Sequence, residues 1–236
     1  MRPFSNSALL DLWERGSGLH PLDQGLLALG WALPGAPGPG PADWPLGRRN
    51  KLLLDLHSSF FGPTLEGWSA CGVCGEKMEF AIDGRTLAGD AAAETNSDVA
   101  VHFKGQSFRL PSSRDLAEAA RQTDTVAAVL CLIRRCNSGP QSGTEWKAAD
   151  VEEIGERMAQ ADPLAEIRLS LKCPACGQQS TETIEIAGFL WSKIEAQAKR
   201  MIWEVHTLAA AYGWSEQQIL SMSPARRSRY LEMVHT

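Results

Sequence analysis

Cys71-Gly-Val-Cys74-Gly75 and Cys173-Pro-Ala-Cys176-Gly177 are two copies of one pattern, a Cys-x-x-Cys pair followed at once by glycine. Each pair lies next to stretches in which apolar and polar residues alternate, such as residues 78–82 after the first pair and residues 167–171 before the second. Such alternation is typical of half-buried strands. The sequence therefore predicts, twice, a strand, a tight turn that carries two thiols, and a second strand.

A Cys-x-x-Cys turn points both sulfurs into one concavity, and the glycine after it permits the backbone conformation that such a knuckle requires. Two facing knuckles give a tetrahedral site of four thiolates, with Zn–S distances near ~2.3 Å. We therefore predict a four-Cys zinc ribbon in which Cys71, Cys74, Cys173 and Cys176 bind one zinc ion. The ion would be structural, because four thiolates leave no open position for water.

The two halves of the predicted ribbon are far apart in the sequence. Residues 75–172 place 98 residues between them, whereas a compact ribbon has about 15–20. A large insertion must therefore return the chain to the metal. Two alternatives remain: a thioredoxin-like redox pair, which needs a helix where a strand pattern follows Gly177, and four unligated thiols in a reducing compartment.

Helical patterns flank both halves, so the predicted fold class is α+β: a four-Cys zinc ribbon with a small antiparallel sheet, wrapped by helices from the long insertion and the C-terminus. We expect residues 1–47 to form an N-terminal helical segment with a Gly/Pro-rich linker, and residues 48–236 to form the zinc-ribbon and helical domain. The parts of the second domain are the ribbon halves 65–83 and 165–188, the helical insertion 112–161 and the C-terminal helices 188–235.

Local signals add detail to this plan. Lys104-Gly105 between two apolar runs predicts a β-hairpin. One helix is expected to start after residues 111–113 and to carry apolar residues as far as Ile133. Ser215 with Gln218 predicts a capping box, and Ser223-Pro224 predicts a further helix start.

Composition excludes some classes of protein. Apolar residues at 44% and charged residues at 22% are ordinary for a globular protein. The net charge of −5 argues against a general nucleic-acid binder. Eight Trp against two Tyr indicate a rich core or a partner surface. No export signal follows Met1, and no run approaches the ~18 apolar residues of a membrane span, so we expect a cytoplasmic protein without a membrane partner.

The sequence lacks the motifs of catalysis. The five histidines have no metal-ligand spacing, and neither phosphate-binding nor dinucleotide-binding glycine patterns occur. Residues 67–71 match a nucleophile elbow for three positions and then place Cys71 where glycine is required. Cys131 and Cys136 lie five residues apart near a helix end, which favours buried small side chains over a metal or redox role. We therefore do not expect an enzyme.

Four phrases carry a resemblance to a known family. They are Phe-Gly-Pro-Thr-Leu at 61–65, Arg-Leu-Pro-Ser-Ser-Arg-Asp-Leu at 109–116, Ala-Asp-Pro-Leu-Ala-Glu at 161–166, and residues 205–220 with the Pro-x-Arg-Arg that follows. Together with the cysteine pairs they resemble the T4-type phage baseplate protein family of contractile phage tails and contractile injection systems. The resemblance implies a baseplate or baseplate-assembly protein, with the family's cysteines at Cys71, Cys74, Cys173 and Cys176 and no catalytic residues.

The expected function is a non-enzymatic structural or chaperone-like assembly protein of a contractile-tail or injection-system baseplate. Its partners would be baseplate or tail proteins, and it would be cytoplasmic or incorporated in a phage-tail-like particle. The residues predicted to contact partners are Trp203, His206, Tyr212, Trp214, Arg226 and Arg227. For His206 the alternative is a partly buried histidine, and for the arginines it is a solvated face with one member paired to a carboxylate. The alternative function is a zinc-ribbon nucleic-acid-binding regulatory protein, which the acidic charge disfavours.

Overall fold

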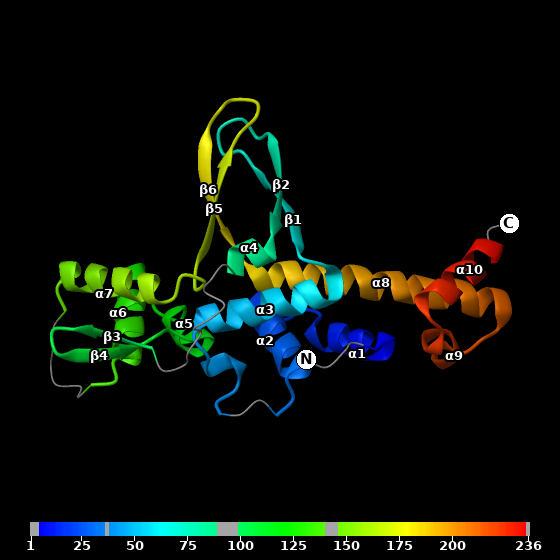
Figure 1. Ribbon diagram of the computed structural model, residues 1–236, viewed down its shortest axis with the longest axis horizontal. Helices are drawn as coiled ribbons and strands as arrows, with labels where there is room; N and C mark the ends of the chain where they lie inside the picture. The colour runs from blue at the N-terminus through cyan, green and yellow to red at the C-terminus, as the bar shows by residue number, and fades with distance from the viewer. Residues whose placement is uncertain (1–4, 36–37, 89–98, 140–145, 235–236) are drawn as a thin grey trace. The chain divides into compact units, whose positions relative to one another are not determined.

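The computed structural model describes residues 5–35, 38–88, 99–139 and 146–234 (Figure 1). It is an α+β structure of helices and small antiparallel sheets. The chain forms two compact units, one of Met1–Pro34 with Ala187–Thr236 and one of Gly35–Ile186. This division differs from the expected one near residue 47, because the N-terminal helices pack with the C-terminal ones.

The first unit is entirely helical in its described part. Its elements are α1 (Asn6–Gly16), α2 (Pro21–Ala32), α8 (Ile186–Tyr212), α9 (Glu216–Ser221) and α10 (Pro224–Val234). The predicted caps are present: Ser215 and Gln218 form a capping box, and the backbone N–H of Arg226 donates to Ser223 Oγ at 3.3 Å. None of the described helices is both long and apolar enough to cross a bilayer.

The long helix α8 provides the core of this unit. Ile194 and Ala198 lie one turn apart on its inner face, and neither side chain is exposed. Near its start, the buried indole of Trp191 lies against the last residue of α1, Gly16. A methyl group at Gly16 would lie 2.1 Å from a ring carbon of Trp191, so only glycine permits this approach.

A buried ion pair joins α8 to α10. Glu204 and Arg227 are 5% and 1% exposed, and Arg227 Nε donates to Glu204 Oε2 at 2.7 Å. Arg227 Nη1 also donates to the carbonyl oxygen of Met222, and Arg200 Nε donates to the other oxygen of Glu204. This pairing fixes the last helix against the end of α8.

Every strand in the described part of the chain belongs to the second unit. Its helices are η1 (Pro41–Asp43), α3 (Leu46–Phe61), α4 (Gly84–Ala88), α5 (Ser113–Ala119), α6 (Thr125–Cys136) and α7 (Ala148–Ala161). Its strands are β1 (Thr64–Ala70), β2 (Lys77–Asp83), β3 (Ala100–Phe103), β4 (Gln106–Arg109), β5 (Ile167–Lys172) and β6 (Gln179–Ile184). They pair as three separate antiparallel hairpins, β1–β2, β3–β4 and β5–β6.

The insertion between the cysteine pairs has a hydrophobic core of its own. The predicted hairpin β3–β4 is confirmed, with Lys104 and Gly105 at φ of 46° and 75°, which is the left-handed backbone that a two-residue turn requires. Phe108 and Ile154 are fully buried where this hairpin meets α6 and α7. Trp146 packs edge-on against Phe108 at a centroid distance of 5.6 Å.

The prediction of one helix from residue 113 to Ile133 is wrong, because two helices, α5 and α6, cover this stretch. The chain leaves the helical path after α5, and Asp124 starts α6 by accepting a hydrogen bond from the backbone N–H of Ala127 at 2.8 Å. A capping side chain of this kind stabilises a helix start within an apparently continuous pattern. The apolar period alone did not reveal the interruption.

Candidate metal centre

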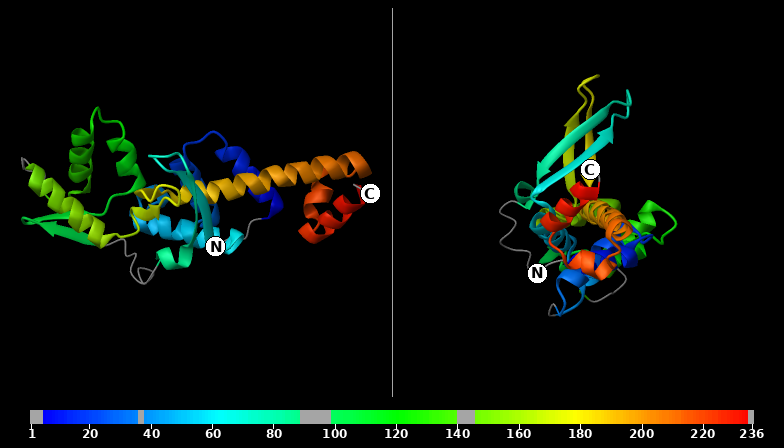
Figure 2. Two further views of the ribbon diagram at one scale, coloured as in Figure 1. Left: turned by 90° about the horizontal axis from the view of Figure 1, so that it is seen from above. Right: turned by 90° about the vertical axis from the view of Figure 1, so that its right-hand side faces the viewer.

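Two of the hairpins bring the four cysteines together. In β1–β2 the register pairs Ala70 with Lys77, so the first Cys-x-x-Cys occupies the connecting turn. In β5–β6 Lys172 pairs with Gln179, and the second Cys-x-x-Cys occupies the corresponding turn. Figure 1 and the right-hand view of Figure 2 show the two hairpins side by side with their turns at the same end.

The first knuckle is closed by backbone hydrogen bonds. The N–H of Cys71 donates to the carbonyl oxygen of Glu76 at 2.8 Å, and the N–H of Gly75 donates to the carbonyl oxygen of Cys71 at 2.8 Å. Gly75 has φ of 75°, which confirms the need for glycine after the second cysteine.

The second knuckle repeats this geometry. The N–H of Cys173 donates to the carbonyl oxygen of Gln178 at 2.8 Å, and that of Gly177 donates to the carbonyl oxygen of Cys173 at 3.0 Å. Gly177 has φ of 74°. Two turns 102 positions apart thus share one conformation, as their common sequence pattern predicts.

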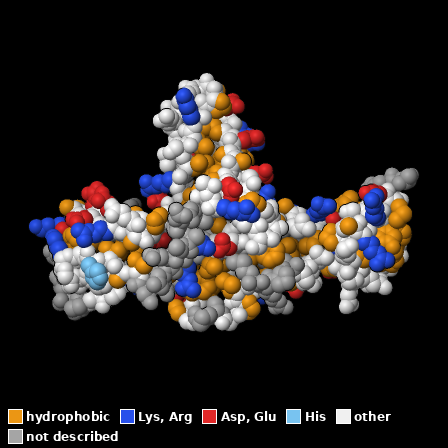
Figure 3. Space-filling view, in the orientation of Figure 1, with side chains coloured by type: hydrophobic (Ala, Val, Ile, Leu, Met, Phe, Trp, Pro, Cys, Tyr) orange, Lys and Arg blue, Asp and Glu red, His pale blue; other side chains and the backbone are white. Residues whose placement is uncertain are grey.

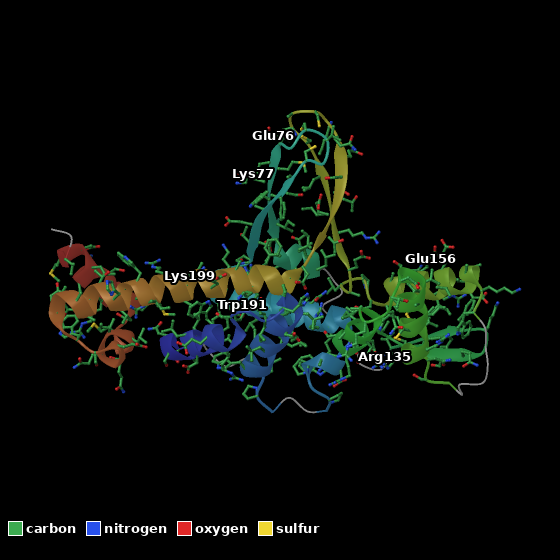
Figure 4. All side chains as sticks on the ribbon, turned by 180° about the vertical axis from the view of Figure 1, so that it is seen from behind. Glu76, Lys77, Arg135, Glu156, Trp191 and Lys199 are labelled. Carbon is green, nitrogen blue, oxygen red and sulfur yellow. The ribbon has the colours of Figure 1, made fainter. Side chains whose placement is uncertain are left out.

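The four sulfurs face one another across the hairpins. Cys71 Sγ lies 3.6 Å from Cys176 Sγ, and Cys74 Sγ lies 3.6 Å from Cys173 Sγ. All four lie within 4.8 Å of one another. A regular tetrahedron with bonds of ~2.3 Å from metal to sulfur has edges of roughly 3.8 Å. The sulfurs are therefore close to the positions that a tetrahedral ion requires. Figure 4 shows sulfur atoms at the tip of the hairpin pair, near Glu76.

The four thiols influence one another's protonation. Hydrogen bonds from the backbone N–H groups of Cys74 and Val73 lower the pKa of Cys71 to about 6. The N–H of Glu76 lowers the pKa of Cys74, but the sulfurs of Cys176 and Cys173 outweigh it and raise that pKa to about 12. Four neighbouring thiols cannot all lose their protons unless a positive charge lies among them.

Each knuckle buries its first cysteine and exposes its second. Cys71 and Cys173 are 4% and 1% exposed, and they form a small apolar cluster with Met78 and the partly buried Leu171. Cys74 and Cys176 are exposed. A tetrahedral ion bound by all four sulfurs would have no open position for a further ligand.

Helix α3 explains how the distant halves meet. It continues through Gly62 and Pro63 into β1. At its other end, Asp162 Oδ2 accepts a hydrogen bond from the N–H of Gly47 at 2.9 Å, and Asn50 Nδ2 donates to the carbonyl oxygen of Leu164 at 2.7 Å. The segment that leads into β5 is thus bound to the helix that leads into β1.

Asp162 belongs to the phrase at residues 161–166, and its role in the fold is not evident from the sequence. Its buried carboxylate caps α3 from a distance, because the residue before that helix, Pro45, has no capping side chain. Burial raises the pKa of Asp162, although the N–H of Gly47 and the charge of Arg49 oppose the shift. No local pattern signals such a long-range cap.

The residues predicted to contact partners do not form one continuous set. Trp203 and His206 are exposed on α8, with Trp203 50% exposed. Tyr212 and Trp214 stack at a centroid distance of 4.5 Å, and both contact the ring of Tyr230.

The two arginines in that prediction differ. Arg226 lies over the ring of Tyr230 at 5.9 Å and is exposed. Arg227 is buried against Glu204 and is not part of a surface, so the expectation of a partner contact there is corrected. The alternative expectation, that one arginine of this group pairs with a carboxylate, describes Arg227.

In the insertion, Cys136 is fully buried, and desolvation raises its pKa to about 12, as suits an inert core thiol.

Comparison of the chain with protein-family models, with curated proteins and with solved structures finds no match.

Proposed function

We propose that Cys71, Cys74, Cys173 and Cys176 bind one structural zinc ion and form a zinc ribbon. The observation that carries this proposal is the near-tetrahedral set of four sulfurs on two matching knuckles. A tetrahedral thiolate set suits zinc, and it also suits iron. Because zinc has no redox chemistry, it is the metal for a site whose role is to hold two hairpins together.

The metal would fix the ends of two hairpins whose bases are already held at α3. A pair of two-stranded hairpins has little apolar surface to bury and is marginal in water. With both ends held, their outer faces become rigid surfaces. A rigid surface without an open metal position is suited to protein contact rather than catalysis.

We propose further that the chain is a non-enzymatic structural or assembly protein of a contractile-tail or injection-system baseplate, acting through baseplate or tail proteins. The four phrases that resemble the T4-type baseplate family support this role, as do the cysteines at corresponding positions. The acidic net charge of −5 supports a protein partner over a nucleic acid.

The test is co-purification of the tagged chain from cells that express the complete tail or injection-system gene cluster. We expect baseplate components in the eluate, identified by mass spectrometry, and their loss when all four cysteines are replaced by serine. Recovery of the chain without any baseplate component contradicts the role. Tight, salt-sensitive binding of the purified chain to duplex DNA would favour the regulatory alternative instead.

A further inference from the structure

The outer face of β1–β2 carries an exposed tryptophan beside carboxylates. Alternate residues of these strands are exposed, and the side that carries Glu66, Trp68, Glu79 and Ala81 is called the outer face here. Trp68 is 62% exposed and is paired in register with Glu79, while Glu66 on the same strand is paired with Ala81. An exposed indole on a hairpin is costly unless a partner covers it, and tryptophan is enriched at interfaces.

The same residues surround a shallow hollow of about 550 Å³. Its lining is Glu66, Gly67, Trp68, Glu79, Phe80 and Ala81. The indole and the two carboxylates supply its functional groups, and Ala81 leaves space between them. An aromatic face beside carboxylates is the arrangement that attracts a cationic side chain.

A lysine of the same hairpin already demonstrates this chemistry. Lys77 Nζ lies 5.5 Å from the centroid of the Trp68 ring and 2.9 Å from Glu79 Oε1. The side chains of Lys77 and Glu79 are 55% and 75% exposed, so their pairing is solvated and weak. An incoming cation can therefore displace Lys77 at small cost. Figure 4 shows Lys77 on β2, just below the turn at Glu76.

The charge of the unit is mildly acidic over its whole sequence. Residues 35–186 contain 21 Asp and Glu against 15 Lys and Arg. Figure 3 shows acidic side chains along the β1–β2 side of the hairpin pair. Within the described residues of this unit the balance is 17 against 15, so the attraction of a cation rests on the local carboxylates of Glu66 and Glu79 beside Trp68.

We propose that the outer face of β1–β2 is a docking site for a lysine or arginine side chain of a partner protein. The cation lies on the indole of Trp68 and pairs with the carboxylates of Glu79 and Glu66. This inference rests on the proposed function, because it assigns a contact surface to a protein that is proposed to act by binding other proteins.

The test follows the indole N–H signal of Trp68 by NMR in the metal-loaded full chain, with the signal assigned through Trp68→Phe. The probes are Nα-acetyl-lysine methylamide and its arginine counterpart, with the norleucine compound as the uncharged match. We expect a saturable shift with both cations and none with norleucine. Glu79→Gln should weaken binding at least about 5-fold, and Lys77→Met should tighten it about 2- to 10-fold by removing the internal competitor.

The matched control is Glu166→Gln, which removes an exposed carboxylate of the same unit that pairs with Arg168. This variant should leave binding at Trp68 unchanged. Unaltered metal content and unfolding profiles establish that each variant is folded. The proposal is refuted if Trp68 does not respond, if norleucine acts equally, if Lys77→Met fails to tighten binding, or if Glu166→Gln weakens it as much as Glu79→Gln. A chain that co-purifies with baseplate components without a Trp68 response refutes this site alone. A response without co-purification refutes the baseplate role alone.

Discussion

The carboxylate of Asp115 joins the start of α5 to the end of α6 through hydrogen bonds with Ser112 and Arg135. Its side chain is fully buried, and it accepts hydrogen bonds from Arg109 Nη1 and Nη2 at 2.6 and 2.9 Å and from Arg135 Nε at 2.8 Å. The backbone N–H and the hydroxyl of Ser112 donate at 3.0 and 2.7 Å. We predict that Asp115→Asn destabilises the unit of residues 35–186 strongly and in a pH-dependent way.

The magnitude follows from these contacts. Removing one partner of a buried ion pair costs about 3–5 kcal/mol. The side chains of Arg109 and Arg135 are 44% and 35% exposed and regain part of their hydration, so we expect a loss of about 2–3 kcal/mol in the free energy of unfolding at pH 7. The control is Asp43→Asn, which breaks the solvated pair with Arg114 and should change stability far less.

The pH dependence has a defined sign. Burial acts to raise the pKa of Asp115, but the hydrogen bonds from Arg109, Ser112 and Arg135 outweigh it and hold the pKa well below 3.8. A carboxyl group with a lowered pKa in the folded state stabilises the fold above its unfolded pKa, and that contribution is lost as pH falls through the folded value. The difference between the natural chain and Asp115→Asn should therefore be constant from pH 7 to pH 5 and shrink below about pH 4, by up to ~1.4 kcal/mol per pH unit.

The assay is urea unfolding followed by circular dichroism at pH 7, 5, 4 and 3. Metal release in acid affects both chains alike and cancels in their difference. A loss for Asp115→Asn no larger than that for Asp43→Asn, or a difference that persists undiminished at pH 3, would contradict the stabilising role of the buried carboxylate.

Further substitutions test other parts of the structure. Gly16→Ala should lower the free energy of unfolding by about 1–3 kcal/mol, because the new methyl would lie 2.1 Å from the indole of Trp191. Gly30→Ala, which has open space around it, should raise the free energy of unfolding by about 0.5–1 kcal/mol. Changes of the same sign for both variants in urea unfolding would contradict this prediction. Arg227→Met leaves a buried carboxylate with one partner and should cost about 2–3 kcal/mol, while the solvated Arg229→Met should change the urea midpoint little. Cys173→Ala should abolish metal binding and lower the melting temperature while most of the helical circular dichroism persists, and an unchanged melting profile would contradict a stabilising metal.

The elements predicted well from the sequence are those fixed by neighbouring residues. The glycines after each Cys-x-x-Cys have the positive φ that their position implies, and the turn at Lys104 and Gly105 has the conformation of a two-residue hairpin. Ser215 and Gln218 cap α9 as their spacing indicates. Such features depend on a few consecutive residues, so the sequence states them directly.

The features that were not predicted depend on residues far apart. The N-terminal helices pack with α8 because Gly16 admits the ring of Trp191, a match that only the folded chain reveals. The cap on Gly47 comes from Asp162, 115 positions away. The interruption between α5 and α6 depends on Asp124, whose capping role was hidden within a continuous apolar period.

The phrases that carry the family resemblance have a structural role in this chain. Arg109, Ser112 and Asp115 form the buried network at the start of α5, and Asp162 and Leu164 join α7 and β5 to α3. These stretches therefore position the insertion and the second hairpin.

The metal content of the chain, purified without added metal and measured by inductively coupled plasma mass spectrometry, tests the proposed zinc site. We expect one zinc per chain, and none in a variant with serine at Cys71, Cys74, Cys173 and Cys176. Iron in place of zinc, or metal-free protein with four titratable thiols at these positions, would contradict a structural zinc ribbon.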